Sequence, residues 1–290
     1  MKNNIEVIVI LVNYHTELET KNIVEKYDSM HIIDEIIVVD NESTEKSRKI
    51  LNDINSNKLK IINNQVNSGY SIGNNIAMKS VAPTQKKRFF IISNSDIDVD
   101  ELVIQKIIED LNANYRYGAL APLMFDKRGK PNYYRSIPLN YKRLFLRAFS
   151  FKIDKRNYDK LIVHSDGIIE QSYLPGSFFI CTEEAMIACQ YFDENVFLYR
   201  EEEILALRMN RSGYLLGIDP SVKFIHNHQY HKESLSYHIK MIKQMNISEK
   251  YYFKEYFKAN KLEMLYVDFM QKIFLLRYLI KVIVKTRDGS

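Results

Sequence analysis

Residues 7–13 read Val-Ile-Val-Ile-Leu-Val-Asn, six apolar side chains in a row followed by an asparagine. β-Branched residues favour strands, and a strand that is apolar at consecutive positions is buried on both faces, as in a parallel sheet. Further apolar runs follow at 36–39, 59–62, 89–92 and 119–124. Segments with helical spacing lie between them, at 18–27, 45–54, 72–81 and 101–114. This alternation predicts an α/β fold with a doubly wound, mixed but mainly parallel sheet flanked by helices.

The composition favours a globular protein of a reducing compartment. The chain has 290 residues, of which 46% are hydrophobic and 27% charged, so wholesale disorder is excluded. Its two cysteines, Cys181 and Cys189, form no CxxC motif, which argues against a disulfide framework and a zinc ribbon. The apolar run 7–12 is too short for a signal peptide, and Arg277 and Lys281 interrupt the run 273–284. We therefore expect a cytoplasmic protein.

The net charge of +5 is concentrated near the C-terminus. Residues 239–290 carry 11 Lys and Arg against 5 Asp and Glu, so the rest of the chain carries a net charge of −1. A near-neutral body argues against a nucleic-acid partner. We expect an α/β domain over 1–236 and a basic, aromatic-rich helical extension over 237–290. The basic, Tyr-rich segment 126–172 predicts an irregular excursion over the surface.

Two interpretations of the C-terminal extension remain open. It is either a helical cap that packs on the domain with a solvated basic face, or an amphipathic surface that rests on an anionic membrane as a peripheral contact. The second interpretation rests on the basic residues around the last apolar run, which are Lys272, Arg277, Lys281, Lys285 and Arg287.

Polar residues follow the predicted strands at their carboxyl ends, where open α/β sheets bind ligands. They include Asn13, the run Asp40-Asn41-Glu42-Ser43, Asn63-Asn64, and the run 93–98 with Asp96 and Asp98. Each alone is explained as a turn residue or helix cap. Several at one edge of one sheet favour a binding site. Neither GxGxxG nor a phosphate-binding GxxxxGK[ST] loop is present, which argues against dinucleotide oxidoreductases and P-loop ATPases.

Asp96 and Asp98 are candidate ligands for Mg²⁺ or Mn²⁺, which take carboxylates together with phosphate oxygens. The alternative is an aspartate cap on the helix that begins near residue 101. His226 and His228 are candidate ligands from a second segment, because an HxH on a strand places both rings on one face. Of the two histidines we favour His228 as the metal ligand, with His226 close behind, although the sequence gives no firm means to choose. Both are equally explained as ordinary exposed or core residues.

Glu201, Glu202 and Glu203 open a predicted helix that ends before Gly213. Acidic residues in a first turn are accounted for by the helix dipole. Since consecutive helical residues point about 100° apart, at most one or two of them face a cleft. A carboxylate there would suit general base catalysis.

Together these motifs resemble inverting glycosyltransferases of family 2, notably the rhamnosyltransferase-like group of bacterial polysaccharide enzymes. The resemblance covers residues 5–236. Val12-Asn13-Tyr14 is similar to the family's VNY, 39–43 to VDNxS, 67–75 to NxGFaxGNN and 93–96 to LN[PS]D. The stretch 192–202 is similar to FDExFFLYxED, followed by Arg211-Ser212-Gly213-Tyr214, and His226-Asn227-His228 follows where the family places a metal-binding histidine.

The resemblance implies a GT-A fold and a role for each matching residue. Asp40 would accept a hydrogen bond from a uracil or thymine base. The other residues implied in nucleotide binding are Asn13, Asn41, Ser43, Asn67, Gly69, Asn74 and Asp96. Those implied in metal binding are Asp96, Asp98, His228 and His226. Glu202 would be the base, with Glu201 beside it.

The resemblance also implies the reaction. A dTDP- or UDP-sugar would donate its sugar to a glycan or a polyprenyl-diphosphate-linked acceptor, with Mg²⁺ or Mn²⁺ as the cofactor. Glu202 stands where the family carries aspartate, which keeps the carboxylate, and Ile204 stands where it often carries an acid. Two alternatives are a catalytically silent module that binds nucleotide sugars or glycans and a sugar-phosphate nucleotidyltransferase. A nucleotidyltransferase would need a Gly-rich basic loop after the first strand, and this sequence lacks one.

Overall fold

The computed structural model describes residues 4–131, 136–149, 163–227 and 234–287. Residue contacts divide the chain into two compact units. The first comprises 1–136, 161–197 and 201–229, and the second comprises 137–160, 198–200 and 230–290. The sequence predicts a boundary at residues 236 and 237. The second unit takes in two earlier segments besides the C-terminal region, because a helix within 137–160 packs with the C-terminal helices.

The first unit is built on one nine-stranded sheet with the order β3-β2-β1-β4-β8-β6-β9-β5, in which β7 pairs with β9 off this path. The strands are β1 (Ile5–Asn13), β2 (Glu35–Asn41), β3 (Leu59–Asn64), β4 (Lys87–Ser93), β5 (Ile97–Asp98), β6 (Tyr117–Asp126), β7 (Ile169–Glu170), β8 (Phe178–Thr182) and β9 (Leu215–His226). The longest pairings, β1–β2, β1–β4, β2–β3 and β6–β9, are parallel. β8 runs antiparallel to β4 and β6. The predicted mixed, mainly parallel sheet is confirmed.

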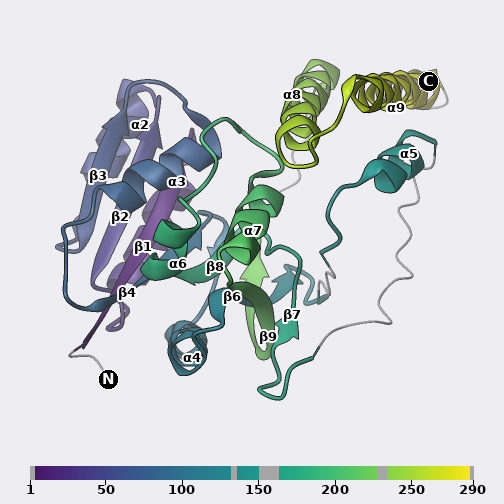
Figure 1. Ribbon diagram of the computed structural model, residues 1–290. Coiled ribbons are helices and arrows are strands. Elements are labelled where there is room, and N and C mark those ends of the chain that lie inside the picture. Colours follow the sequence, from purple (N-terminus) through teal and green to yellow (C-terminus); the bar gives the residue numbers. More distant parts are fainter. Residues whose placement is uncertain (1–3, 132–135, 150–162, 228–233, 288–290) are drawn as a thin grey trace. The chain divides into compact units, whose positions relative to one another are not determined.

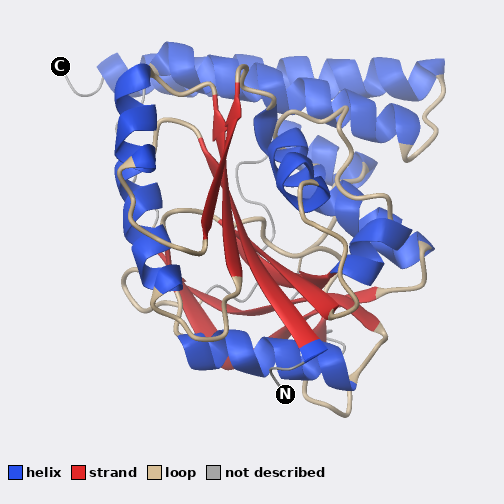
Figure 2. Cartoon of the chain, turned by 90° about the vertical axis from the view of Figure 1, so that its left-hand side faces the viewer, coloured by secondary structure: helices blue, strands red, loops and turns tan. Residues whose placement is uncertain are grey.

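Helices cover both faces of this sheet (Figures 1 and 2). α1 (Glu17–Asp28), α2 (Glu45–Asn52) and α4 (Glu101–Ala113) contribute Tyr27, Leu51 and Ile107 to one core layer. α3 (Gly69–Lys79), α6 (Glu183–Ala188) and α7 (Glu201–Arg211) pack on the other face. Because side chains alternate along a strand, Val9 enters the first layer and Ile10 the second. The prediction of a doubly wound sheet, with helices packed on both of its faces, is confirmed.

The second unit is helical and contains α5 (Tyr141–Phe149), α8 (Leu235–Glu255) and α9 (Lys261–Arg287). The prediction of helices in the C-terminal region is confirmed. The prediction that 126–172 is irregular is wrong for 141–149, since α5 buries Leu144 and Ala148 and stacks Tyr141 on Phe253, with ring centroids 4.8 Å apart. α5 packs chiefly on α9. Within the described residues, no helix is long and apolar enough to cross a membrane.

Candidate active site

The carboxyl ends of the parallel strands bring the predicted polar residues to one edge of the sheet. Asn13 at the end of β1 pairs in register with Asp40 of β2, and Asp40 pairs with Asn63 of β3. β4 lies on the other side of β1 and leads into the segment that carries Asp96. Residues from four consecutive strands therefore meet beside one another, as the spacing of the apolar runs predicts.

Asn13 orients Asp40 and Ser43. Its amide Nδ2 donates to Asp40 Oδ1 at 2.8 Å and to Ser43 Oγ at 3.0 Å, while its Oδ1 accepts from the hydroxyl of Thr20 at 2.9 Å. Asn13 and Asp40 are both completely buried, and the Asn13 amide holds the Asp40 carboxylate in place. Asp40 Oδ2 accepts no hydrogen bond from any described residue, and Arg48 Nε lies 3.6 Å from it. A buried carboxylate oxygen without a hydrogen bond is costly, and a ligand N–H would satisfy it.

Asn41 and Asn67 shape the turn that begins α3. The Asn41 amide donates to the Gly69 carbonyl at 3.1 Å, and Asn67 Oδ1 accepts from the Gly69 N–H at 3.0 Å. Gly69 has a φ of 82°, and a Cβ there would lie 2.2 Å from the Phe197 carbonyl oxygen. Only glycine fits this close approach. Asn41, Asn67 and Gly69 thus bind one another, in the turn directly beside Asp40.

Asp96 and His226 form the candidate metal-binding pair. β5 pairs antiparallel with β9, which sets Ile97 opposite His226, and the Asn227 N–H donates to the Asp96 carbonyl at 2.7 Å. His226 Nε2 lies 3.2 Å from Asp96 Oδ1. Asp96 and His226 are 130 residues apart in the sequence, and the pairing of β5 with β9 brings these two predicted ligands together.

Asp98, a third predicted ligand, forms no metal-binding group with this pair among the described residues. Asp98 forms an ion pair with Lys26 of α1. β9 ends at His226, and His228 lies outside the described residues.

The pair fits a metal that is shared with a ligand. Across the described parts of the chain, no group of three or more His, Cys, Asp and Glu side chains could hold a metal by itself. Mg²⁺ is usually bound through one or two carboxylates plus substrate phosphates, and imidazole suits the later divalent metals. One carboxylate and one imidazole therefore match a cation whose remaining ligands are diphosphate oxygens.

The glutamates at the start of α7 differ in exposure. Glu201 is 6% exposed and Glu203 4%, whereas Glu202 is partly exposed. Glu202 Oε1 accepts a hydrogen bond from the Gly176 N–H at 3.3 Å. Of the three carboxylates, Glu202 is therefore the one with solvent access, and the Gly176 N–H orients it.

Two residues of this cluster, Tyr70 and Gly176, carry no predicted role in the sequence analysis. The Tyr70 hydroxyl donates to the Gly176 carbonyl at 2.6 Å, and Asn74, a predicted nucleotide-binding residue, donates from its amide to the Tyr70 carbonyl at 2.9 Å. The same loop reaches the metal-binding segment, because the Asn94 N–H donates to the Ser177 carbonyl at 2.8 Å. The only sequence signal for Tyr70 is that it stands at the Phe position of the NxGFaxGNN motif.

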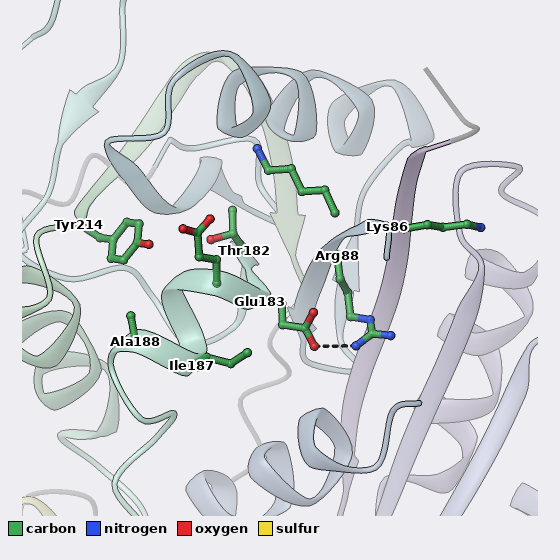
Figure 3. Close-up of a pocket in the computed structure, with 9 residues that line it drawn as sticks. Lys86, Arg88, Thr182, Glu183, Ile187, Ala188 and Tyr214 are labelled. Atoms are coloured by element: carbon green, nitrogen blue, oxygen red, sulfur yellow. Dashed lines mark hydrogen bonds and ion pairs between the residues drawn. The ribbon is translucent and has the colours of Figure 1, made fainter. Parts of the chain in front are cut away.

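A pocket of about 500 Å³ lies at the other end of β4, away from these residues (Figure 3). Lys86, Thr182 and Tyr214 are among the residues that line it. The Arg88 guanidinium within it is occupied by Glu6 and Glu183, each at 2.6 Å. Because the polar residues that follow the strands lie at the opposite edge, this pocket is separate from the candidate active site.

A family model and one known relative match this sequence. The model of the family described as Glycosyl transferase family 2 matches residues 5–169, more than half of the chain. The low-salt glycan biosynthesis hexosyltransferase Agl10 of Haloferax volcanii is 23% identical over 219 residues, which are 76% of this chain and 66% of that protein. The chain thus spans just under two thirds of the length of this relative.

Two solved structures are similar in fold. The mannosyltransferase PcManGT from Pyrobaculum calidifontis, in complex with GDP-Man and Mn²⁺, is 14% identical with a TM-score of 0.57, over 88% of this chain and 65% of that one. S. aureus TarS 1–349, in complex with UDP-GlcNAc, is 14% identical with a TM-score of 0.56, over 93% of this chain and 71% of that one. The chain has the GT-A fold and belongs to glycosyl transferase family 2.

Proposed function

We propose that this chain is a divalent-metal-dependent, inverting glycosyltransferase that moves a sugar from a dTDP- or UDP-sugar to a hydroxyl group of a glycan or of a polyprenyl-diphosphate-linked acceptor. One observation carries the proposal. The loop 176–177 binds Glu202 through the Gly176 N–H, and through the Ser177 carbonyl it binds Asn94, two residues before Asp96. A candidate base and a candidate metal ligand are thus joined by one short segment, as a transferase needs.

The donor nucleotide would bind over Asp40. The unsatisfied Oδ2 of this buried carboxylate suits the imide N–H of uracil or thymine, and Asn13 holds the carboxylate in place through Oδ1. Ser43 and the turn around Asn67 and Gly69 lie beside it and would line the nucleotide pocket. Asn41 and Asn74 would act there by holding this turn and α3.

Asp96 and His226 would hold Mg²⁺ or Mn²⁺ at the diphosphate, and the proposed ligand set also includes Asp98 and His228. When bound, such a cation neutralises the charge that grows on the leaving nucleoside diphosphate. The similar structure of PcManGT, which contains Mn²⁺, supports this part of the proposal.

Glu202 would accept the proton of the acceptor hydroxyl. As the proton leaves, the hydroxyl oxygen forms a bond to the anomeric carbon on the face opposite the diphosphate, and the bond from that carbon to the diphosphate oxygen breaks. A single displacement without a covalent intermediate inverts the anomeric configuration. General base catalysis of this kind contributes about 10²–10⁴-fold.

The acceptor class and the place of action are part of the same proposal. We propose a role in bacterial cell-surface polysaccharide synthesis, with rhamnose among the candidate sugars, at the cytoplasmic side of the membrane. α9 supports a peripheral contact, because one face of it exposes Leu262, Leu265, Phe269, Leu276 and Ile280. Lys261, Lys272 and Lys281 lie exposed along the same helix, and apolar and basic side chains together favour an anionic membrane surface.

A panel of dTDP-, UDP- and GDP-sugars, each assayed for release of the nucleoside diphosphate with Mn²⁺ or Mg²⁺, tests the proposal. We expect at least one dTDP- or UDP-sugar to be turned over, and the turnover to stop in excess chelator. Turnover of GDP-sugars alone would contradict the nucleotide assignment. Donor binding without turnover for every sugar and metal would instead support the silent binding module.

A further inference from the structure

Tyr70 is connected to the proposed base through Gly176 and has no role in the reaction proposed above. Its hydroxyl donates to the Gly176 carbonyl at 2.6 Å, and its backbone N–H donates to the Phe197 carbonyl at 3.0 Å. Its ring packs edge-on against Phe192, with ring centroids 5.7 Å apart. The ring is therefore fixed between the start of α3 and the segment that precedes α7.

Gly176 lies between Tyr70 and Glu202. Its carbonyl accepts from Tyr70, and its N–H donates to Glu202 Oε1 at 3.3 Å. A Cβ at residue 176 would lie 2.8 Å from Glu202 Oε1 and 3.2 Å from Glu202 Cγ. The glutamate side chain therefore lies directly on the glycine backbone, and any larger residue at 176 would displace it.

The charge around Tyr70 agrees with this arrangement. Desolvation raises the pKa of Tyr70 well above its ordinary value of 10.0, and the carboxylates of Glu202 and Glu201 raise it further. The hydroxyl consequently keeps its proton throughout the working pH range and remains a donor to the Gly176 carbonyl. A tyrosine whose ionisation is opposed by two carboxylates is a stable anchor beside them.

We infer that Tyr70 and Gly176 are positioning residues for Glu202: the Tyr70 hydroxyl fixes the Gly176 backbone, and the Gly176 N–H orients the carboxylate that takes the acceptor proton. The inference rests on the proposed role of Glu202. It predicts a loss in kcat that depends on Glu202. Donor binding should change little, because loss of the Tyr70 hydroxyl removes only its bond to Gly176 and leaves the backbone of the Gly69 turn and the hydrogen bonds of Asn41 and Asn67 in place.

The test begins with Tyr70→Phe, which removes one hydroxyl and leaves the packing of the ring. A hydrogen bond of this kind contributes about 0.5–1.5 kcal/mol, so we expect kcat to fall about three- to tenfold while the KM for the donor stays within twofold. Tyr266→Phe is the matched control, because it removes a hydroxyl that donates to the Tyr141 carbonyl in the second unit. It should leave kcat unchanged. Gly176→Ala should lower kcat more than Tyr70→Phe does.

A double-mutant cycle with Glu202→Gln, measured as single turnovers, separates positioning from a general structural role. We expect Tyr70→Phe to cause no further loss in the Glu202→Gln background. Equal fold losses in both backgrounds, or a wild-type kcat for Tyr70→Phe, would overturn the inference and leave the base assignment intact. Wild-type turnover of Glu202→Gln alone would overturn the base assignment and the inference with it.

Discussion

Glu202 and Glu201 are neighbours with different surroundings, and substitutions that keep their size should separate them. We expect Glu202→Gln to lower turnover about 10²–10⁴-fold, because the amide cannot accept the acceptor proton. The donor Kd should stay near the wild-type value. Glu201→Gln should cost much less turnover, since Glu201 is almost completely buried. Steady-state kinetics and calorimetric donor titration measure both, and the reverse order of losses would move the base to Glu201.

The two aspartates proposed as metal ligands also differ in what they contact. Asp96 lies beside His226, whereas Asp98 forms an ion pair with Lys26. We expect Asp96→Asn to raise the Mn²⁺ concentration needed for half-maximal activity by at least about tenfold, the effect of losing 1.4 kcal/mol. Asp98→Asn should shift it less. A larger shift for Asp98→Asn would show that Lys26 releases Asp98 to the metal when the donor binds.

The sequence predicts individual site residues best where one strand end or one motif holds them. Asp40 and Asp96 follow strands, and both lie where the strand pattern places them. Tyr70 and Gly176 are 106 residues apart, and their hydrogen bond depends on how α3 meets the loop before β8. No local pattern encodes such a contact, so it required the structure.

At the scale of elements, α8 contributes a buried carboxylate to the second unit. Glu249 is completely buried and accepts from Arg147 Nη2 at 2.7 Å, from Arg200 Nη2 at 2.8 Å and from Gln271 Nε2 at 3.1 Å. Burial alone would raise the pKa of Glu249, but the hydrogen bond and charge of Arg147 and the charge of Arg200 lower it below its ordinary value of 4.5. The ionised form is therefore the stable one in the folded protein.

This lowered pKa gives a stability prediction with a definite sign. Glu249→Gln should lower the free energy of unfolding by about 3–5 kcal/mol at pH 7, because two arginines lose their buried partner. The contribution of Glu249 is present above the unfolded pKa and is lost as the pH falls through the folded pKa. Urea unfolding at several pH values measures the free energy of unfolding of both proteins. The difference between wild type and variant in this free energy should become smaller below about pH 4.5. A difference that widens towards low pH would contradict the assignment.

The exposed face of α9 predicts a contact with the membrane. Substitutions on this face test the prediction better than removal of the C-terminal residues would. Removing residues after Met270 would also remove Gln271, which binds Glu249. The triple variant Leu265→Ser, Phe269→Ser and Leu276→Ser leaves the buried face intact. It should weaken sedimentation with anionic vesicles at low salt by more than about tenfold, since each buried apolar side chain contributes about 1.5–3 kcal/mol. Leu102→Ser, at an exposed residue of α4, is the control, and equal sedimentation of both variants would identify α9 as a cap alone.

Helices and strands could be predicted where the pattern of apolar residues within the segment itself determines its structure. All five long apolar runs of the first 126 residues are strands, and the four segments between them are helices. β5 and β7 have two residues each and exist only because β9 lies beside them. Such strands form because a neighbouring strand pairs with them. Two residues are too few to show the alternation of apolar and polar side chains by which a strand is predicted. The sequence analysis did not predict α5, because its amphipathic pattern lies within a segment rich in turn residues.

At the scale of the whole molecule, family membership and fold leave the sugar and the acceptor open. The similar structures contain GDP-Man in one case and UDP-GlcNAc in another, so the GT-A fold alone does not choose the nucleotide. In the proposed function, that choice is made by the side chains at the carboxyl edge, above all Asp40. The proposed reaction depends on the same edge, because the residues proposed to hold the donor and the metal lie where the parallel strands end, and the proposed base contacts the loop beside them.

The anomeric configuration of the released sugar tests the central claim most directly. Donor hydrolysis or transfer, followed by proton NMR before mutarotation, should first show the anomer opposite to that of the donor, and only when Mn²⁺ or Mg²⁺ is present. Chelator should abolish the signal, and Asp96→Asn should reduce it at limiting metal. A first product with the donor's own configuration, or full turnover in excess chelator, would contradict metal-dependent inverting transfer at this site.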